Sequence, residues 1–312
     1  MSFPTRFNLA DLFEAQADAF GDRLALVSGD LRMSYAELDQ RATRLANYFA
    51  SQGLGEGDHI GLYLYNGHEY LECMLAAWKI RARTINVNYR YVADELRYIF
   101  ENAELKALVY EPDLAEFVAP TATKAMGLLL QRGPDYEAAL SSAASGRDFA
   151  ERSDDDLCII YTGGTTGMPR GVMWRHEDFY VAGLQGGNPG GEAFESPEQA
   201  VRQLTINGDG LHIHCPAPMI HGSGQLAAWI ALFNGGVAVI VPGRSYRPDE
   251  TLRVCAAESV HSINIVGDAM ALPLVQELEA SPGVHDLREL QVISSAGAVL
   301  SGNVRELSLI HI

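Results

Sequence analysis

The chain has 312 residues, of which 47% are hydrophobic and 20% charged, and its formal net charge is -17. This length and composition are typical of a globular protein with a large core and two subdomains. The excess of acidic residues argues against a nucleic-acid-binding surface and against a polybasic membrane anchor, because both need clustered lysine and arginine.

The sequence also bears on the cellular compartment. No apolar run approaches the roughly 20 residues of a membrane-spanning helix, and the first residues lack the apolar core of a signal peptide. The four cysteines, Cys73, Cys158, Cys215 and Cys255, form no Cys-x-x-Cys pair, which is typical of buried thiols in a reducing compartment. We therefore expect a cytoplasmic protein without a transmembrane segment; nothing in the sequence indicates an oligomeric state.

Helix and strand patterns alternate through the first half of the chain. Apolar spacing predicts a helix over residues 9–20, and the capping box Ser34–Glu37 predicts a second helix, whose apolar face includes Phe49. Further strands are expected at residues 24–27, 59–65, 84–88 and 107–110, and further helices at 70–78 and 93–102. This alternation predicts α/β layers around mostly parallel sheets.

The second half begins with an expected surface connection at residues 131–156, which contains Pro134 and a Ser/Ala/Gly-rich stretch. We interpret the aspartates at 154–156 as a solvated turn or helix start rather than a metal site. A glycine-rich loop is expected at 186–191, and strands at 211–215, 237–241, 262–266 and 290–294. The fold class is therefore predicted to be α/β, with two doubly wound, mostly parallel subdomains at residues 1–175 and 176–306.

The most distinctive segment is an eleven-residue run with four glycines, three threonines and one arginine. The run consists of Tyr161, Thr162, Gly163, Gly164, Thr165, Thr166, Gly167, Met168, Pro169, Arg170 and Gly171. Glycine lets backbone N–H groups turn toward a ligand, and successive N–H groups form a concave anion site. Together with the hydroxyls and the cation, the run indicates a cradle for a polyphosphate; the alternative is a flexible surface loop.

The residues on either side define the context of this run. A buried strand is expected at 157–161, and residues 172–174 are apolar again before a helical pattern at 175–178. The run lacks the Gly-x4-Gly-Lys-Ser/Thr spacing of a Walker A loop, and its proline opposes a helix that starts at the phosphates. We therefore expect backbone amides and threonine hydroxyls, more than a helix dipole, to bind the anion.

The run resembles the phosphate-binding signature of the AMP-forming adenylating enzymes, which include acyl-CoA synthetases, luciferases and peptide-synthetase adenylation domains. That signature is Tyr-Thr-Ser-Gly-Thr-Thr-Gly-x-Pro-Lys-Gly, and this chain has Gly163 for serine and Arg170 for lysine. Arginine keeps the charge but replaces a point charge by a planar fork. The extension at 173–178 resembles a branch of fatty-acyl and sterol-side-chain CoA synthetases.

Four further segments resemble the same family in the same order, so that the similarity covers nearly all of residues 7–306. They are residues 32–38, 86–91 with Glu95 and Leu96, 216–222, and 294–301, the last with Ala296 and Val299 as departures. Several motifs in the right order are far more specific than one.

The resemblance implies that a carboxylate attacks the α-phosphate of ATP, pyrophosphate leaves, and CoA then takes the acyl group. It implies ATP, Mg²⁺ and CoA as cofactors and a fatty or sterol-side-chain acid as the small-molecule substrate. His221 would border the carboxylate, Thr162 would lie near Mg²⁺, and Gly297 and Ala298 would form a wall against adenine. The residues implied in holding phosphates are Thr162, Gly163, Gly164, Thr165, Thr166, Gly167 and Arg170.

Alternatives to this interpretation concern a metal and the class of protein. His212, His214, Cys215 and His221 could suggest zinc, but strand alternation places the first two opposite Cys215, which disfavours such a site. Instead of an acyl-CoA synthetase, the chain could be a non-catalytic nucleotide-binding protein of the same fold, or another adenylate-forming ligase.

Parts of the family pattern do not occur in these 312 residues: the Tyr-Gly-x-Thr-Glu motif, the ribose-binding aspartate segment and the C-terminal domain with its catalytic lysine. We therefore expect a fragment that completes neither half-reaction alone. Residues 307–312 can be encoded by the mosaic end of a sequencing adapter, so the native part is expected to end near Glu306. The alternative is a genuine C-terminal strand.

Overall fold

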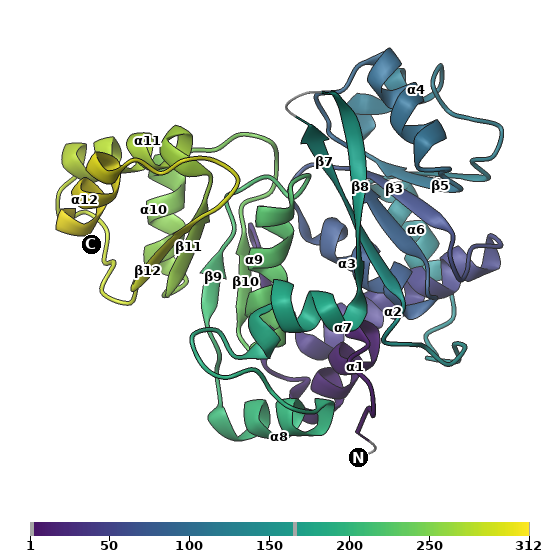
Figure 1. Ribbon diagram of the computed structural model, residues 1–312, viewed down its shortest axis with the longest axis horizontal. Helices are drawn as coiled ribbons and strands as arrows, with labels where there is room; N and C mark the ends of the chain where they lie inside the picture. Colours follow the sequence, from purple (N-terminus) through teal and green to yellow (C-terminus); the bar gives the residue numbers. More distant parts are fainter. Residues whose placement is uncertain (1–2, 165–166, 312) are drawn as a thin grey trace.

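A computed structural model describes residues 3–164 and 167–311. In Figure 1 the strands β9 to β12 lie on one side of a long hairpin, β7–β8, and β3 and β5 lie on the other; α9 lies between the first group of strands and the hairpin. None of the helices in these described ranges is long and apolar enough to cross a membrane.

The elements have the following bounds. The strands are β1 (Leu24–Ser28), β2 (Leu31–Ser34), β3 (His59–Tyr63), β4 (Arg83–Asn86), β5 (Ala107–Tyr110), β6 (Leu128–Gln131), β7 (Leu157–Gly164), β8 (Gly167–Arg175), β9 (His212–His214), β10 (Val237–Ile240), β11 (Ser262–Ile265) and β12 (Val292–Ser295). The α-helices are α1 (Leu9–Phe20), α2 (Tyr35–Ser51), α3 (His68–Lys79), α4 (Ala93–Asn102), α5 (Ala115–Val118), α6 (Pro134–Ser142), α7 (His176–Asp178), α8 (Pro197–Asn207), α9 (Gly222–Phe233), α10 (Pro248–Ala257), α11 (Gly267–Ala280) and α12 (Gly302–His311). Short 3-10 or π-helical turns are η1 (Pro112–Leu114), η2 (Phe179–Gly183) and η3 (Gln185–Gly187).

The larger sheet has six strands in the order β12-β11-β9-β10-β1-β2. Its neighbouring strands are parallel, apart from the antiparallel pair β1–β2 at one edge. Strands β10 and β11 are buried along their whole length, as expected of parallel strands that helices cover on both faces.

The smaller sheet has four parallel strands in the order β4-β3-β5-β6. On one face, α4 buries Leu96, Ile99 and Phe100 against the sheet. On the other, α2, α3 and α6 join a core that continues to the larger sheet. The predicted α/β class with mostly parallel, doubly wound sheets is confirmed.

Most expected elements are confirmed, including α1, α4 and the capping box at Ser34, whose hydroxyl accepts from the Glu37 N–H at 3.2 Å. The expected connection at 131–156 is wrong in part, because it contains α6, which buries a short apolar face. The last described residues continue α12 through His311, so the C-terminal strand considered as an alternative does not form.

Sheet membership does not follow the two halves of the chain. Strands β1 and β2 precede residue 175, yet β1 pairs in parallel with β10. The N-terminal strand therefore completes the sheet of the later residues. The boundary at residue 175 and the native end near Glu306 stay predictions.

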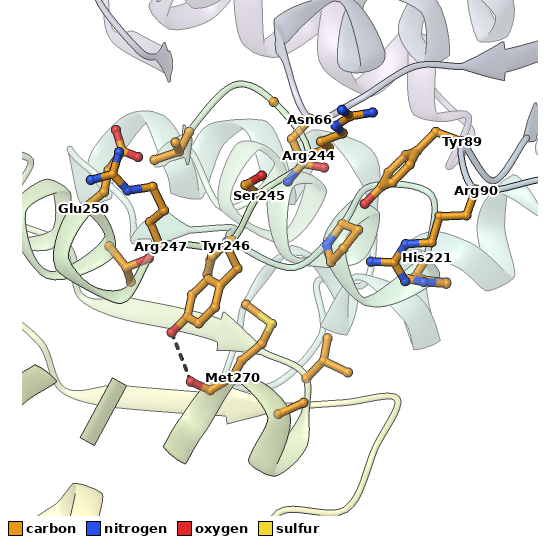
Figure 2. A pocket seen from close by; sticks show the side chains of 17 residues that line it. Asn66, Tyr89, Arg90, His221, Arg244, Ser245, Tyr246, Arg247, Glu250 and Met270 are labelled. Atoms are coloured by element: carbon orange, nitrogen blue, oxygen red, sulfur yellow. Dashed lines mark hydrogen bonds between the residues drawn. The ribbon is translucent and has the colours of Figure 1, made fainter. Parts of the chain in front are cut away.

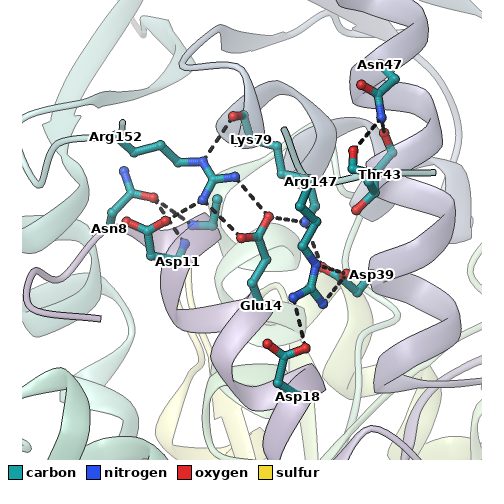
Figure 3. Close-up of polar contacts among 12 residues, drawn as sticks. Asn8, Asp11, Glu14, Asp18, Asp39, Thr43, Asn47, Lys79, Arg147 and Arg152 are labelled. Carbon is teal, nitrogen blue, oxygen red and sulfur yellow. Dashed lines mark hydrogen bonds and ion pairs between the residues drawn. The ribbon is translucent and has the colours of Figure 1, made fainter. Parts of the chain in front are cut away.

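The segment that leads into β7 is fixed by buried ion pairs (Figure 3). Lys79, whose side chain is 0% exposed, lies 2.6 Å from a Glu14 oxygen and 2.7 Å from an Asp39 oxygen. Arg152 pairs with Glu14 at 2.9 Å and donates to the Lys79 carbonyl at 3.0 Å. Asp156, the last of the three aspartates, accepts from the Ser153 N–H at 3.0 Å, as expected of a turn. It is not solvated as expected, because its side chain is 8% exposed and pairs with Arg81 at 2.9 Å. These contacts tie the start of β7 to α1, α2 and α3.

Candidate functional site

The glycine–threonine run forms the tip of an antiparallel hairpin. Strand β7 pairs with β8, with Thr162 opposite Arg170 and Gly164 opposite Gly167. The extended segments expected on both sides of the run are confirmed. Thr165 and Thr166, two of the expected phosphate-binding residues, lie outside the described residues.

The tip presents main chain and positive charge to solvent. Thr162, Gly163, Gly167 and Arg170 are exposed, and a Cβ built on Gly163 or Gly167 would meet no atom within 4 Å. Packing therefore does not require glycine at these two positions, and an open backbone suits close approach of an anion. Among the residues that the structure describes, Arg170 has no carboxylate partner, so its guanidinium can bind an anion.

The residues present fit a magnesium ion carried by a nucleotide better than a resident metal. Within the described ranges, no cluster of three or more His, Cys, Asp or Glu side chains could hold a metal ion. Mg²⁺ in nucleotide sites takes few protein ligands beside phosphate and water, for which the exposed Thr162 hydroxyl is a suitable partner. The same finding covers the alternative zinc site: in the described part of the chain, His212, His214, Cys215 and His221 do not come together as a group that could hold a metal ion.

Asn86, at the end of β4, links the hairpin to the segment before His221. Its Oδ1 accepts from the Tyr161 N–H at 2.7 Å, and its Nδ2 donates to the Tyr161 carbonyl at 2.8 Å. The same Nδ2 donates to the Ile220 carbonyl at 2.6 Å. Gly222 lies against the hairpin as well, since a Cβ there would be 3.6 Å from the Ile160 side chain. The hairpin base and the His221 segment are therefore neighbours.

Two further amides shape the segment 216–221. Asn66 accepts from the Met219 N–H at 2.8 Å and donates to the Ala217 carbonyl at 3.2 Å. Gln225, in the first turn of α9, donates to the Met219 carbonyl at 2.8 Å. Gly224 must be glycine, because a Cβ would lie 2.6 Å from the Ala217 carbonyl oxygen. The polar groups of this irregular segment are thus satisfied by side chains, and His221 is placed at the N-cap of α9.

His221 lines a cavity of about 300 Å³. Figure 2 shows Tyr89, Arg90 and His221 at one end of this cavity. Tyr246, Arg247 and Glu250 lie toward the opposite end. Partial burial and the charge of Arg90 lower the pKa of His221, so the imidazole is neutral at neutral pH. Within the described part of the chain no hydrogen bond occupies this ring, which leaves both nitrogens available to a ligand.

Gly297 and Ala298 lie outside the lining of this cavity. They follow β12 in a loop that wraps the start of α11, where the Asp268 N–H donates to the Val299 carbonyl at 3.1 Å. Gly297 has φ +85°, which favours glycine. A Cβ on Gly297 would be 3.8 Å from Val266, which does line the cavity. The predicted adenine wall therefore borders the cavity through Val266 and is itself exposed.

The sequence did not identify Asn66 and Gln225 as site residues, and Asn86 was noted only as part of a family-like segment. The position of Asn86 at the end of an apolar strand could have indicated its role, because a buried asparagine needs hydrogen-bond partners. The partners lie far away in sequence, so the pattern could not identify them.

The chain is similar to proteins of one known family. The model of the family described as AMP-binding enzyme matches residues 13–307 of the chain. A medium/long-chain-fatty-acid–CoA/3-oxocholest-4-en-26-oate–CoA ligase of Mycolicibacterium smegmatis is 39% identical over 318 residues, which cover 96% of this chain and 57% of that protein. A 3-oxocholest-4-en-26-oate–CoA ligase of Rhodococcus rhodochrous is 40% identical over 319 residues, with the same shares covered. The chain thus spans little more than half the length of these curated relatives.

A solved structure is similar in fold. The N-terminal domain of FACL13 from Mycobacterium tuberculosis, in an inhibitor-bound crystal structure, gives a TM-score of 0.83 at 20% identity. The match covers 98% of this chain and 73% of that one. At this identity, the likeness supports the architecture and not a substrate.

Proposed function

The chain belongs to the AMP-binding enzyme family, and on that premise we propose that it is the nucleotide- and acid-binding part of an ATP-dependent carboxylic acid–CoA ligase. In the proposed reaction, a carboxylate attacks the α-phosphate of ATP and pyrophosphate leaves. The thiol of CoA then attacks the acyl carbon, and AMP leaves. A carboxylate needs this activation because oxide is a very poor leaving group.

One observation carries the proposal: the signature hairpin and the segment 216–222 resemble two motifs of one family, and Asn86 bonds to both. In the proposed site, Thr162, Gly163, Gly164, Gly167 and Arg170 bind the triphosphate, together with Thr165 and Thr166. Their N–H groups, hydroxyls and single cation would oppose the negative charge of the departing pyrophosphate. Mg²⁺, when bound with ATP, would supply further charge neutralisation there.

The remaining expected residues take roles around the acid and the nucleoside. His221 is proposed to border the carboxylate, where its neutral imidazole can hydrogen-bond to an oxygen without introducing a competing cation. Gly297 and Ala298 are proposed to contact adenine through their backbone. The assignment of CoA as the acyl acceptor, and of the cytoplasm as the location, rests on the relatives and on the sequence, and both belong to this proposal.

The acid is proposed to be a medium- or long-chain fatty acid or a sterol side-chain acid. The names of the two relatives describe such acids. Met219 and Ile220, beside His221, are buried apolar residues that do not line its cavity, so the choice of acid rests on the names of the relatives.

Two measurements test this function. Isothermal titration of the 312-residue chain with MgATP is expected to show binding that Arg170→Ala weakens. ATP–pyrophosphate exchange by the complete gene product, with a panel of carboxylates, is expected to depend on a fatty or sterol acid. Absence of nucleotide binding would contradict the proposal; binding without exchange for any acid would favour the non-catalytic alternative. Exchange by the chain alone would contradict the prediction that it completes neither half-reaction.

A further inference from the structure

Asn86 uses its whole amide in contacts with two distant segments. The residue is 6% exposed, and β4, which it ends, is one of the two edge strands of the four-stranded sheet. Its amide pairs with both backbone groups of Tyr161, as one peptide group pairs with another across a sheet ladder. The second Nδ2 hydrogen is directed to the Ile220 carbonyl at 2.6 Å. Both donors and one acceptor site are thereby satisfied.

The two segments that Asn86 joins end next to proposed site residues. Tyr161 directly precedes Thr162, and Ile220 directly precedes His221. They lie 75 and 134 residues from Asn86 in sequence. A single amide group therefore bonds both the residue before the phosphate-binding tip and the residue before the histidine.

Gly222 packs beside Ile160, but the other side-chain hydrogen bonds of the hairpin do not reach the His221 segment. A two-stranded hairpin is marginally stable by itself and takes its orientation from its neighbours. The Tyr98 hydroxyl donates to the Pro169 carbonyl at 3.1 Å, and the Tyr161 hydroxyl donates to Asn102 at 2.9 Å. Both of these bonds reach α4 only. Among the hydrogen bonds between described residues, only those of Asn86 join the hairpin to the His221 segment.

We propose that Asn86 is a positioning residue, which holds the phosphate-binding hairpin and His221 at the separation that acid adenylation requires. This inference rests on the proposed function. The carboxylate must attack the α-phosphate in line, so the group that borders the acid and the groups that hold the phosphates must keep a fixed separation. A misplacement of about 1 Å can cost about 100-fold in rate. Asn86 touches neither substrate in this proposal and acts through the backbone of its two partners.

Pyrophosphate exchange by the complete gene product separates positioning from simple structural support. For Asn86→Ala we expect kcat, corrected for the folded fraction, to fall about 10- to 100-fold. KM for ATP should change less than about threefold, because the nucleotide contacts of the hairpin tip remain. The matched control is Asn102→Ala, which removes a bond to the same tyrosine but does not reach Ile220; its kcat should stay within about twofold of the unmodified protein.

A second variant gives a signature that lost packing would not. In Asn86→Asp, the carboxylate can still accept from the Tyr161 N–H, but it faces two carbonyl oxygens without a hydrogen. A protonated carboxyl regains one donor, so the kcat deficit relative to the unmodified protein should shrink as pH falls. This nearly isosteric variant also serves if Asn86→Ala does not fold.

Several outcomes would overturn the inference. They are an unchanged kcat in folded Asn86→Ala, an equal loss in Asn102→Ala, or a deficit in Asn86→Asp that does not vary with pH. Absence of exchange in the unmodified protein would remove the proposed function and the inference with it. Normal exchange by Asn86→Ala would remove only the inference.

Discussion

The ring of Tyr161 fills the space that a side chain at Gly171 would need. The two residues pair across the hairpin, and a Cβ on Gly171 would lie 2.8 Å from the Tyr161 Cε2 and 2.9 Å from the Ile159 Cγ2. At the tip, by contrast, a Cβ on Gly163 would meet nothing. Two positions of one signature run therefore favour glycine for different physical reasons. Gly171 leaves room for packed side chains, and Gly163 leaves the backbone open to a ligand.

This difference predicts that alanine at Gly171 lowers stability, whereas alanine at Gly163 lowers nucleotide binding. Gly171→Ala should lower the free energy of unfolding by about 1–3 kcal/mol, because the hairpin must move to admit the methyl group. Gly163→Ala should change it by less than about 0.5 kcal/mol, yet weaken MgATP binding by crowding the backbone. Urea unfolding and isothermal titration measure the two effects. Equal destabilisation by both variants would contradict the distinction.

The sequence predicted the local elements well because their signals are local. The capping box at Ser34, the apolar face of α1 and the helix α4 are set by neighbouring residues, and all three are confirmed. The Gly/Thr run and its apolar flanks likewise indicated a loop between two extended segments, and the structure adds that these segments pair as a hairpin.

What the sequence could not supply depends on partners that are far apart. The pairing of β1 with β10 decides which sheet the N-terminal strand joins, and no local pattern encodes it. The sequence also failed to indicate α6, because the buried face of this helix is only a few residues long. The same limit applies to the site: Asn86 meets Tyr161 and Ile220 only once both sheets are assembled.

The buried ammonium of Lys79 should be essential to stability. It lies between Glu14 and Asp39 with its side chain fully buried. Lys79→Met removes their shared cation but leaves Glu14 paired with Arg152 and Asp39 paired with Arg147, so the free energy of unfolding should fall by about 1–3 kcal/mol. The matched control is Arg97→Met, which breaks an exposed pair with Asp94 and should cost less than about 1 kcal/mol. Urea unfolding at neutral pH compares them; similar losses would show that the network contributes little.

Two buried histidines should make the fold sensitive to mild acid. Burial lowers the pKa of His176 to about 3 and that of His214 to about 4. Between pH 6.5 and those values, the unfolded chain binds a proton at each site and the folded chain does not. Stability is therefore fully present above pH 6.5 and is lost as pH falls, by up to about 1.4 kcal/mol per pH unit for each histidine.

Urea unfolding at pH 7, 6 and 5 measures this slope. His176→Gln cannot be protonated, so it should flatten the dependence while the contribution of His214 remains. Because the Leu9 N–H donates to the His176 Nδ1 at 3.3 Å, the variant can be less stable at every pH. Only the change of slope is diagnostic, and an unchanged slope would contradict the assignment.

Arg170 tests the anion site with little interference from folding. It is exposed, and it has no carboxylate partner among the described residues, so Arg170→Ala should change the free energy of unfolding by less than about 0.5 kcal/mol. A hydrogen bond to a charged group is worth about 1.5–3 kcal/mol, so MgATP binding by the chain should weaken roughly 10- to 100-fold. Arg170→Lys keeps the cation and should retain most of the affinity, although a point charge cannot reproduce a bidentate contact. The nucleoside adenosine lacks phosphate and should bind the unmodified chain and both variants alike. If adenosine and MgATP lost affinity equally in Arg170→Ala, the arginine would not be contacting the phosphates.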